Sequence, residues 1–466
     1  MDRVRRVAGI LLQLVDVVEA LVAEAVGTGL GLEGIEGRVQ GAVQRAAAGI
    51  MEVVLEGVDH RLMLERGRGL TVVGKRSRTL LTSFGELQVT RRLYRGEGGQ
   101  GFFLLDRALK VGARGRVSRR LLGLAVELGC AMPFRQAARA LGWMAPALSP
   151  MGVWKALREA GEACREEMAG RRRRVFEEGE LSSGVRRVRE LKVEADSVAV
   201  RLQRSEDRWG ELKLVVAYEG REKVGGERSE RYALKNRWVA AAVATGDAMW
   251  EEAGVQFGDR WALDQVDKVW VGGDGAAWVK GGLKWFPRSA FVLDRFHLRR
   301  RLLEAVGQDP ELHHWVSVAL AANSLPQTLE VLRAAARVRQ GKARKNVEGL
   351  MAYLAANWDG IAGLPARGLT GAIEGQVYHQ ISRRMKRNGA RWSLAGADRM
   401  ARLLAARANG ELDRYLHRPL PVPQTAARPV PLAAAVGANP EELWRVGMPA
   451  LYGPAAGQLW VKVLRE

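Results

Sequence analysis

The chain has 466 residues, of which 47% are hydrophobic, so it is long enough for two to four domains that each bury a core of their own. Its 73 Lys and Arg residues outnumber 52 Asp and Glu residues, and arginine clusters recur along the whole chain, which favours a polyanionic partner such as DNA or RNA; a basic protein from a GC-rich genome is the alternative. Two cysteines without a CxxC pair exclude a disulfide framework and a structural zinc site, and favour a reducing interior.

Residues 1–66 are predicted to form one or two helices, because apolar residues recur there at helical spacing: Ile10, Leu14, Val17, Leu21 and Ala25. This stripe belongs either to a core or to a self-association surface. The same stretch contains Asp16, Glu19 and Glu24 and lacks a small-residue cleavage site. It therefore reads as neither a signal peptide nor a membrane span, and no membrane partner is expected.

Residues 67–115 show the alternation and glycine punctuation of a β-hairpin. Residues 116–185 then read as three helices, the last with Ser149 as N-cap and Pro150 in its first turn. A short helix, a turn and a longer basic helix resemble a helix-turn-helix, so Lys155 and Arg158 are candidate DNA contacts. Any three-helix bundle gives a similar pattern, which keeps that alternative open.

Residues 186–296 have a β-rich texture. The runs "ELKVEADS", "VAVRLQR" and "GELKLVVAYEG" suggest three consecutive antiparallel strands; a helix near residues 246–263, the strand "DKVWVGGD", the helix-like "GAAWVKGGLKWF" and the strand "SAFVLD" follow. This succession predicts a ribonuclease H-like mixed sheet with strand order 3-2-1-4-5. The expected fold class is thus multidomain α/β, with an α-helical, helix-turn-helix-like DNA-binding region before the catalytic core.

The rest of the chain is predicted to be mainly helical. Residues 297–370 contain no convincing strand and read as an all-α insertion, and residues 371–415 would return to the core with a helix that carries Glu374. Residues 416–466 hold a proline-rich linker, at 418–431, and a tail.

Asp196 and Asp274 form a candidate acidic pair. Asp196 lies within the first predicted strand and Asp274 ends the fourth, and in the order 3-2-1-4-5 these strands are neighbours, about 4.8 Å apart. Two divalent ions that clamp the attacking and leaving oxygens of a phosphodiester need such hard oxygen ligands, which suits Mg²⁺ or Mn²⁺. A third carboxylate is needed to complete the site.

Asp294 and His297 are the candidate supporting pair. Asp294 ends the outer strand and is a poorer metal ligand than Asp274, while His297, one turn into the next helix, could hydrogen-bond Asp294 or a phosphate. An N-cap aspartate and a satisfied buried histidine are the alternative interpretation. Glu374 alone would be an ordinary acidic residue in a first helical turn. Together with Asp196 and Asp274, and before a basic helix, it becomes the candidate third ligand.

Several long motifs carry a family resemblance: "VEADSVAVRLQR", "GGDGAAWVKGGLKWFPRSAFVLDRFHLRR" and "IEGQVYHQISRRMKRNGARWSLAGADRMARL", with "TSFGELQVTRRLYR" and "FFLLDRAL" before them. Across about residues 75–410 the chain resembles the DDE transposases of the ISLre2 group of bacterial insertion sequences, also catalogued as UPF0236-type proteins. At one position it departs from them, because Ser197 stands where a glycine is expected, which would place a small side chain beside the site.

The resemblance implies that Asp196, Asp274 and Glu374 are a catalytic, metal-binding triad, with Asp294 and His297 in a recurrent Asp/Cys-x-x-His feature. It also implies two Mg²⁺ ions, which Mn²⁺ could replace, and cleavage of transposon ends followed by 3′-OH strand transfer into target DNA. Double-stranded DNA and further copies of the chain are the expected partners, in the bacterial cytoplasm at the nucleoid. Trp392 matches the family pattern, and the candidate DNA contacts near the cut are Arg383, Arg384, Lys386, Arg387 and Trp392.

Two other function classes fit the same residues. A ribonuclease H-like nuclease or resolvase would cleave without strand transfer, and a domesticated DNA-binding protein would not cleave at all. The "GGDG" at residues 272–275 is too short for a dinucleotide loop, and the sequence has no GxxxxGK[ST] motif, so ATP use is not expected.

Overall fold

The computed structural model describes residues 2–96, 99–111, 116–144, 148–181, 184–225, 231–362 and 371–416. They divide into two compact units: the first comprises described residues up to 125 together with 135–153, and the second comprises 126–134 and the described residues from 154 to 416. The proline-rich linker and tail predicted for residues 416–466 lie outside the described residues, apart from Leu416. Within the described ranges, no helix has the combination of length and apolar character that crossing a bilayer requires.

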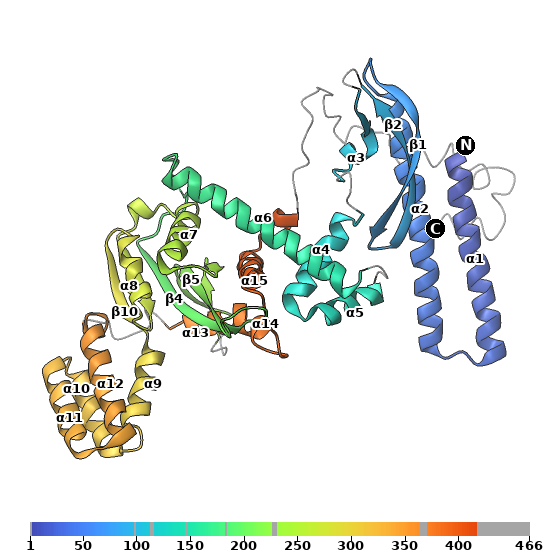
Figure 1. Cartoon of the computed structure of the whole chain (residues 1–466). Helices are drawn as coiled ribbons and strands as arrows, with labels where there is room; N and C mark the ends of the chain where they lie inside the picture. Colours follow the sequence, from blue (N-terminus) through green and yellow to red (C-terminus); the bar gives the residue numbers. More distant parts are fainter. Residues whose placement is uncertain are drawn as a thin grey trace. The chain divides into compact units, whose positions relative to one another are not determined.

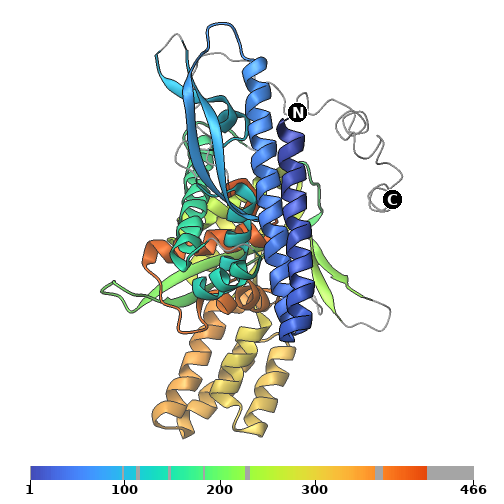
Figure 2. The same ribbon diagram turned by 90° about the vertical axis from the view of Figure 1, so that its right-hand side faces the viewer.

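The first unit combines a helix pair with a small sheet. Helices α1 (Asp2–Thr28) and α2 (Leu32–Leu64) lie side by side (Figure 2). Strands β1 (Thr71–Thr82), β2 (Gly85–Arg95) and β3 (Gly101–Phe103) form an antiparallel sheet in the order β1-β2-β3, and α3 (Leu104–Ala108) follows. Leu87 and Val89 alternate inward from β2 and pack with Leu55 of α2 and Leu105 of α3. The predicted N-terminal helices and β-hairpin are confirmed.

Three further helices match the sequence prediction in number: α4 (Arg119–Ala131), α5 (Phe134–Met144) and α6 (Pro150–Phe176). The Ser149 hydroxyl accepts a hydrogen bond of 3.1 Å from the amide of Gly152, which confirms Ser149 as the N-cap of α6. These helices are shared between the two units. DNA binding by this region stays a prediction.

A five-stranded mixed sheet organises the second unit (Figure 1), in the order β10 (Ser289–Leu293), β9 (Lys268–Gly273), β4 (Glu190–Arg201), β5 (Trp209–Tyr218), β8 (Trp238–Ala242). β4 pairs in parallel with β9 and antiparallel with β5, β9 pairs in parallel with β10, and β5 pairs antiparallel with β8. Numbered along the chain, this is the predicted order 3-2-1-4-5.

One part of the strand prediction was wrong. "ELKVEADS" and "VAVRLQR" are not two strands, because β4 continues through Ser197, which pairs with Lys213 of β5 without a break in register. The third strand of the meander is β8, in a segment whose sequence gave no strand signal. Between β5 and β8 lies a separate two-stranded ribbon, β6 (Gly220–Lys223) and β7 (Tyr232–Lys235).

Helices α7 (Gly246–Gly258) and α8 (Ala277–Gly281) cover one face of the sheet. The odd-numbered residues in the first half of β4 enter an apolar core with α7 and α8, and this core includes Leu191, Val193, Ala195, Trp250, Phe257 and Val279. Because side chains alternate along a strand, even-numbered residues of β4 point to the opposite face. The short 3-10 turns η1 (Leu263–Gln265) and η2 (Gly282–Lys284) complete this region, so the predicted helix of residues 275–286 is shorter than expected.

A bundle of four helices follows β10 (Figure 1): α9 (Arg295–Val306), α10 (Pro310–Ala321), α11 (Leu325–Val338) and α12 (Gly341–Asn357). They share a core that includes Val316, Leu332, Val347, Leu350 and Leu354. The 3-10 turn η3 (Trp358–Gly360) packs on β10. The described residues of the predicted all-helical insertion are therefore helical and turn structure without a strand.

The chain then returns to the sheet. A helical segment contains α13 (Ile373–Gln376), the π-helical turn η4 (Val377–Ser382) and α14 (Arg383–Met385); α15 (Leu394–Ala408) and η5 (Leu412–Leu416) come next. α13 contacts β4 and β5, while α15 contacts β5 and β8.

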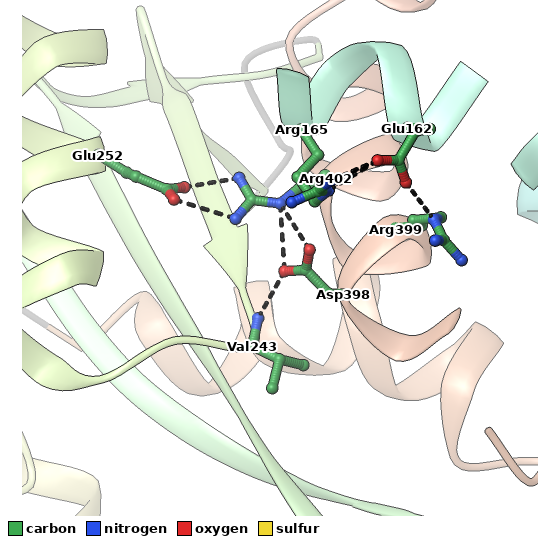
Figure 3. A network of polar contacts seen from close by, with 7 residues as sticks. All are labelled: Glu162, Arg165, Val243, Glu252, Asp398, Arg399 and Arg402. Carbon is green, nitrogen blue, oxygen red and sulfur yellow. Dashed lines mark hydrogen bonds and ion pairs between the residues drawn. The ribbon is translucent and has the colours of Figure 1, made fainter. Parts of the chain in front are cut away.

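A polar network fixes α15 (Figure 3). Arg402 donates through its two terminal nitrogens to both oxygens of Glu252 on α7, at 2.7 and 3.0 Å, and through Nε to Asp398. Asp398 also accepts from the amide of Val243, just after β8, at 3.0 Å. The Glu252 side chain is 7% exposed and that of Arg402 10%, so α15 is joined to α7 by a largely buried ion pair.

Candidate functional site

Asp196 is a buried acidic residue in the middle of β4. It is only 8% exposed and lies on the face of β4 opposite the core with α7 and α8, because it occupies an even position of the strand. Its Oδ1 accepts a hydrogen bond of 2.7 Å from the amide of Ser197. Burial raises the pKa of Asp196 to about 6, and the nearby carboxylates of Asp274 and Glu374 also raise it.

Asp196, His297 and Glu374 come together from three distant parts of the chain. Each offers one ligand atom, and these atoms all lie within 4.8 Å of one another. β4 supplies Asp196, the first turn of α9 supplies His297, and the first turn of α13 supplies the exposed Glu374. Two carboxylates and an imidazole at this spacing could share one divalent cation.

His297 is held in place by Asp294. The Nδ1 atom of His297 lies 2.7 Å from Oδ2 of Asp294, whose side chain is almost fully buried, and this hydrogen bond raises the pKa of His297. Asp294 is also the N-cap of α9, since its Oδ1 accepts from the amide of Phe296 at 3.2 Å. The hydrogen bond that the sequence suggested is present, and it coexists with the N-cap role that was the alternative to it.

Asp274 follows β9 directly, next to Asp196, because Ala195 pairs with Gly273 in the parallel register. Its carboxylate accepts from the amide of Ala276 at 2.9 Å, and its carbonyl accepts from the Tyr353 hydroxyl of α12 at 2.9 Å. Asp274 is not in the group of three ligand atoms described above. Its role as a metal ligand stays a prediction.

The loop that carries Asp274 requires a glycine. Gly275 has a φ of +89°, in the left-handed region, and a Cβ at this position would lie 2.3 Å from Oδ1 of Asn357 on α12. Tyr353 and Asn357 thus bring α12 of the helical bundle against this loop. The "GGDG" stretch therefore has a packing explanation.

The basic residues after Glu374 separate into two groups. Arg383, Lys386 and Arg387 are exposed, and Arg387 donates to the Tyr378 hydroxyl at 2.5 Å. Arg384 is 8% exposed, and its Nε donates to the carbonyl of Gly129 at 2.8 Å.

Arg384 and Trp392 are the two expected DNA contacts that the structure contradicts. The Arg384 guanidinium lies 5.1 Å from the ring centres of both Phe134 and Trp392. Trp392 is itself 8% exposed and donates from Nε1 to the carbonyl of Met385 at 3.0 Å. Both side chains are therefore largely buried in packing contacts, which argues against a contact with a phosphate or a base.

Ser197 also differs from its expected place. Strand alternation puts its side chain on the face opposite Asp196. A hydrogen bond with Lys213 lowers the pKa of Glu211 most, and one with the Ser197 hydroxyl adds to that effect. The Ser197 side chain does not lie beside Asp196. On α6, Lys155 and Arg158 are exposed, as DNA contacts would need to be; Lys155 lies 3.9 Å from Glu159, and Arg158 lies over the ring of Trp154.

Sequence reasoning gave His297 only a supporting role and overlooked Glu194. His297 could have been ranked higher because it is the one histidine that follows a strand-ending aspartate by three residues. Glu194 had a signal too, since a second acidic residue two positions before Asp196 must share its face of the strand.

Comparison with known proteins decides the family. Residues 25–417 match the model of an uncharacterised protein family, UPF0236. The chain belongs to this family. The UPF0236 protein TTE0402 of Caldanaerobacter subterraneus subsp. tengcongensis is 28% identical over 405 residues, which covers 85% of this chain and 77% of the relative.

Further relatives show the breadth of the UPF0236 family. The UPF0236 protein TTE0610/TTE0881/TTE1053/TTE2432 of the same organism is 27% identical over 405 residues, and the match covers 85% of this chain and 81% of the relative. The UPF0236 protein in vanSb 3′region of Streptococcus gallolyticus is 25% identical over 358 residues, which covers 74% of this chain and 76% of the relative. The family thus has many paralogues.

Proposed function

We propose that this UPF0236 protein is a DNA transposase of the DDE type, from the ISLre2 group of insertion sequences. It would bind terminal inverted repeats, cleave DNA strands at the element's ends and join the freed 3′-OH to target DNA. The observation that carries the proposal is the convergence of Asp196 and Glu374, which are 178 residues apart in the chain, with His297. One ligand atom from each of the three side chains lies within 4.8 Å of the other two.

The sheet supports a ribonuclease H-like core. Its order β10-β9-β4-β5-β8, with β8 at one edge and the parallel strands at the other, is the order expected for that fold. The all-helical segment lies between the last strand and the helix of Glu374, as an insertion in such a core would. Fold-level analogy of this kind raises the expectation of nuclease-type chemistry, and the site has to carry the argument.

The donor set fits a divalent metal. Carboxylate oxygens suit Mg²⁺ and Mn²⁺, and an imidazole is a usual ligand of first-row transition metals. Asp196, Glu374 and His297 would hold a first ion, and Asp274, beside Asp196, is the candidate ligand of a second. When bound, two such ions supply activation of the attacking oxygen and charge neutralisation at the leaving oxygen of a phosphodiester.

The protein's own residues would prepare that chemistry. Asp294 fixes the orientation of the His297 ring, so this side chain can approach the ion with little loss of freedom. Tyr353 fixes the backbone of Asp274. Burial is the main cause of the raised pKa of Asp196, and the carboxylates of Asp274 and Glu374 add to it; a bound cation would favour the charged form of this carboxylate.

Exposed basic residues provide candidate contacts for DNA. Arg383, Lys386 and Arg387 are exposed, lie within 13 residues after Glu374 and would bind phosphates near the cut, while Lys155 and Arg158 of α6 would contact the transposon end. A formal charge of +21 favours such binding and makes it dependent on salt. DNA as substrate would place the protein at the bacterial nucleoid in the cytoplasm.

The family comparison adds indirect support. The printed name of one relative joins many locus designations of a single genome, which is what a gene carried by a multi-copy mobile element would produce. No ATP is expected to take part, because cleavage hydrolyses a phosphodiester, which is favourable, and joining breaks one phosphodiester of the target as it forms another.

Joining two element ends would require more than one copy of the chain. We therefore include a homo-oligomer in the proposal. Alongside the stripe that faces α2, α1 has a second apolar stripe that is exposed and spaced by four, three, four and four residues: Leu11, Val15, Val18, Val22 and Val26. A stripe of this spacing fits the corresponding helix of a second copy. Light scattering of the Val15→Asp/Val22→Asp variant should show a smaller assembly than the wild type.

The proposed function is tested with the purified chain and DNA of the element's own ends. With Mg²⁺ or Mn²⁺, the wild type should nick and join strands, whereas Asp196→Asn and Glu374→Gln should not. The matched control is Glu348→Gln, an exposed carboxylate of the helical bundle that pairs with Arg344. Cleavage without joining would favour the nuclease or resolvase instead, and DNA binding without cleavage would favour a non-catalytic protein.

A further inference from the structure

Glu194 is a fully buried carboxylate two residues before Asp196 on β4. Residues two apart on a strand share a face, so both carboxylates point toward the same side of the sheet. A buried charge is costly unless its oxygens are hydrogen-bonded, and therefore its partners explain why it is retained. Burial raises the pKa of Glu194, while hydrogen bonds to its carboxylate act against that rise.

Its partners are three consecutive backbone amides at the start of α13. Oε2 accepts from Gly371 at 2.9 Å, from Ala372 at 3.0 Å and from Ile373 at 3.2 Å. Oε1 accepts from Ala372 at 3.2 Å and from the hydroxyl of Tyr218 on β5. The carboxylate is thus surrounded by donors from both the sheet and the helix.

These amides are the ones that a helix leaves without internal partners. The first turn of a helix has free N–H groups and a partial positive charge, and a carboxylate placed there satisfies both. Side chains next to the helix in sequence usually supply this cap. Here the cap comes from a strand about 180 residues earlier in the chain, and the residue directly after the third amide is Glu374.

Gly371 makes this arrangement possible. Its φ of +106° lies in the left-handed region, where side chains are strained, and a Cβ there would approach Oδ1 of Asp294 to 3.8 Å. The backbone that meets Glu194 therefore also passes beside the aspartate that holds His297. Asp196 is two residues from Glu194, Glu374 directly follows Ile373, and His297 is three residues from Asp294.

We propose that Glu194 is a positioning residue, which locks the helix of Glu374 onto the strand of Asp196 and so sets the separation of the two carboxylates. Its consequence for catalysis rests on the proposed function, whereas its effect on α13 does not. Glu194 needs no contact with DNA or metal to act in this way.

The test compares Glu194→Gln with the wild type and with Glu190→Gln, an exposed residue at the start of the same strand. The glutamine amide would direct its own N–H groups at the backbone donors, so the contact between residue 194 and the start of α13 should open. Hydrogen exchange followed by mass spectrometry should then show exchange at least about tenfold faster in residues 371–382, with α15 unchanged. Unchanged protection of residues 371–382 in a folded Glu194→Gln variant would overturn the proposal.

Kinetics give the second readout. In strand transfer, a displacement of Glu374 of about 1 Å should lower kcat roughly 100-fold while the Kd for DNA stays within a factor of two. Glu194→Asp keeps the charge and should recover part of kcat, which a purely space-filling role would not predict. Equal loss of kcat and of DNA affinity in all folded variants would contradict the proposal.

Two further outcomes are informative. If Glu194→Gln does not fold, Tyr218→Phe removes one donor from Oε1 and leaves the three amides in place, so it should fold and keep residues 371–373 protected; fast exchange there would contradict the assignment. If the wild type shows no strand transfer but Glu194→Gln still loses protection at residues 371–382, the positioning role of Glu194 is supported and the proposed function is wrong.

Discussion

The carboxylate of Asp294 makes two connections at once: Oδ2 holds Nδ1 of His297 at 2.7 Å, and Oδ1 caps the helix on which that histidine lies. The amide of Asp294 in turn donates to the carbonyl of Gly273, at the end of β9, at 2.8 Å. The outer strand, the Asp274 loop and the first turn of α9 are thereby fixed to one another. His297 owes its place beside Asp196 and Glu374 to this arrangement.

The first prediction concerns this pair. Asp294→Asn keeps the shape and one acceptor but weakens the charge-assisted bond to His297, so we expect cleavage to fall by about 10- to 100-fold, as for other residues that orient a metal ligand. Thermal unfolding measured alongside separates this effect from loss of fold. Wild-type activity in a folded Asp294→Asn variant would show that the orientation of His297 is not important.

The second prediction concerns the buried ion pair of Arg402. Arg402→Met leaves Glu252 and Asp398 without their shared cation, and the free energy of unfolding should fall by about 3–5 kcal/mol. Urea denaturation followed by circular dichroism measures this. A double variant, Arg402→Met with Glu252→Gln, should lose less than the sum of the two single changes, because one of the two uncompensated charges is gone. Additive losses would indicate that the pair is not coupled.

The third prediction concerns the Asp274 loop. Gly275→Ala introduces a Cβ at φ +89° and against Asn357, so it should cost about 1–3 kcal/mol of stability from backbone strain, in addition to the clash. The matched control is Gly281→Ala at the end of α8, where an added Cβ would meet no described atom within 4 Å. Thermal unfolding should separate the two variants clearly. A Gly275→Ala protein as stable as the control would contradict the loop geometry.

The fourth prediction concerns the two thiols. Burial raises the pKa of both Cys130 and Cys164 to about 12, so almost no thiolate exists near neutral pH, and both side chains are shielded from solvent. A thiol reagent at pH 8 should label neither residue in the native protein and both in urea. Raising the pH toward 12 should increase labelling, because the thiolate fraction rises. Rapid native labelling of Cys130 would contradict its packing in the second unit.

Much of the fold follows from local patterns in the sequence. Alternation and apolar runs predicted strands at Asp196 and Asp274, and the chirality and length of the connections restrict their order to few choices. The boundary inside β4 was misjudged because a polar residue, Ser197, resembles a turn signal when its pairing partner Lys213 is unknown. β8 was missed because "WVAAA" is short and three of its five residues are alanine, and its burial comes from α7 and α15.

The site was less predictable than the sheet. Asp196 and Glu374 could be chosen from strand position and family resemblance, but the buried stacking of Arg384 between Phe134 and Trp392 could not, because a basic residue in a basic run gives no sign of burial. The place of His297 depends on how α9 leaves the sheet. The role of Glu194 depends on a contact across 177 residues of sequence, which no local periodicity reports.

The central claim is that Asp196 and Glu374 carry metal-dependent DNA strand transfer, and one assay tests it most directly. Labelled DNA with the element's own ends is incubated with the wild type, Asp196→Asn, Glu374→Gln and the Glu348→Gln control, in Mg²⁺ and with chelator. We expect nicked ends and joined products for the wild type and the control in Mg²⁺ alone, and a loss of at least about 1000-fold in both site variants. Joined products from folded Asp196→Asn or Glu374→Gln at wild-type rates would contradict it.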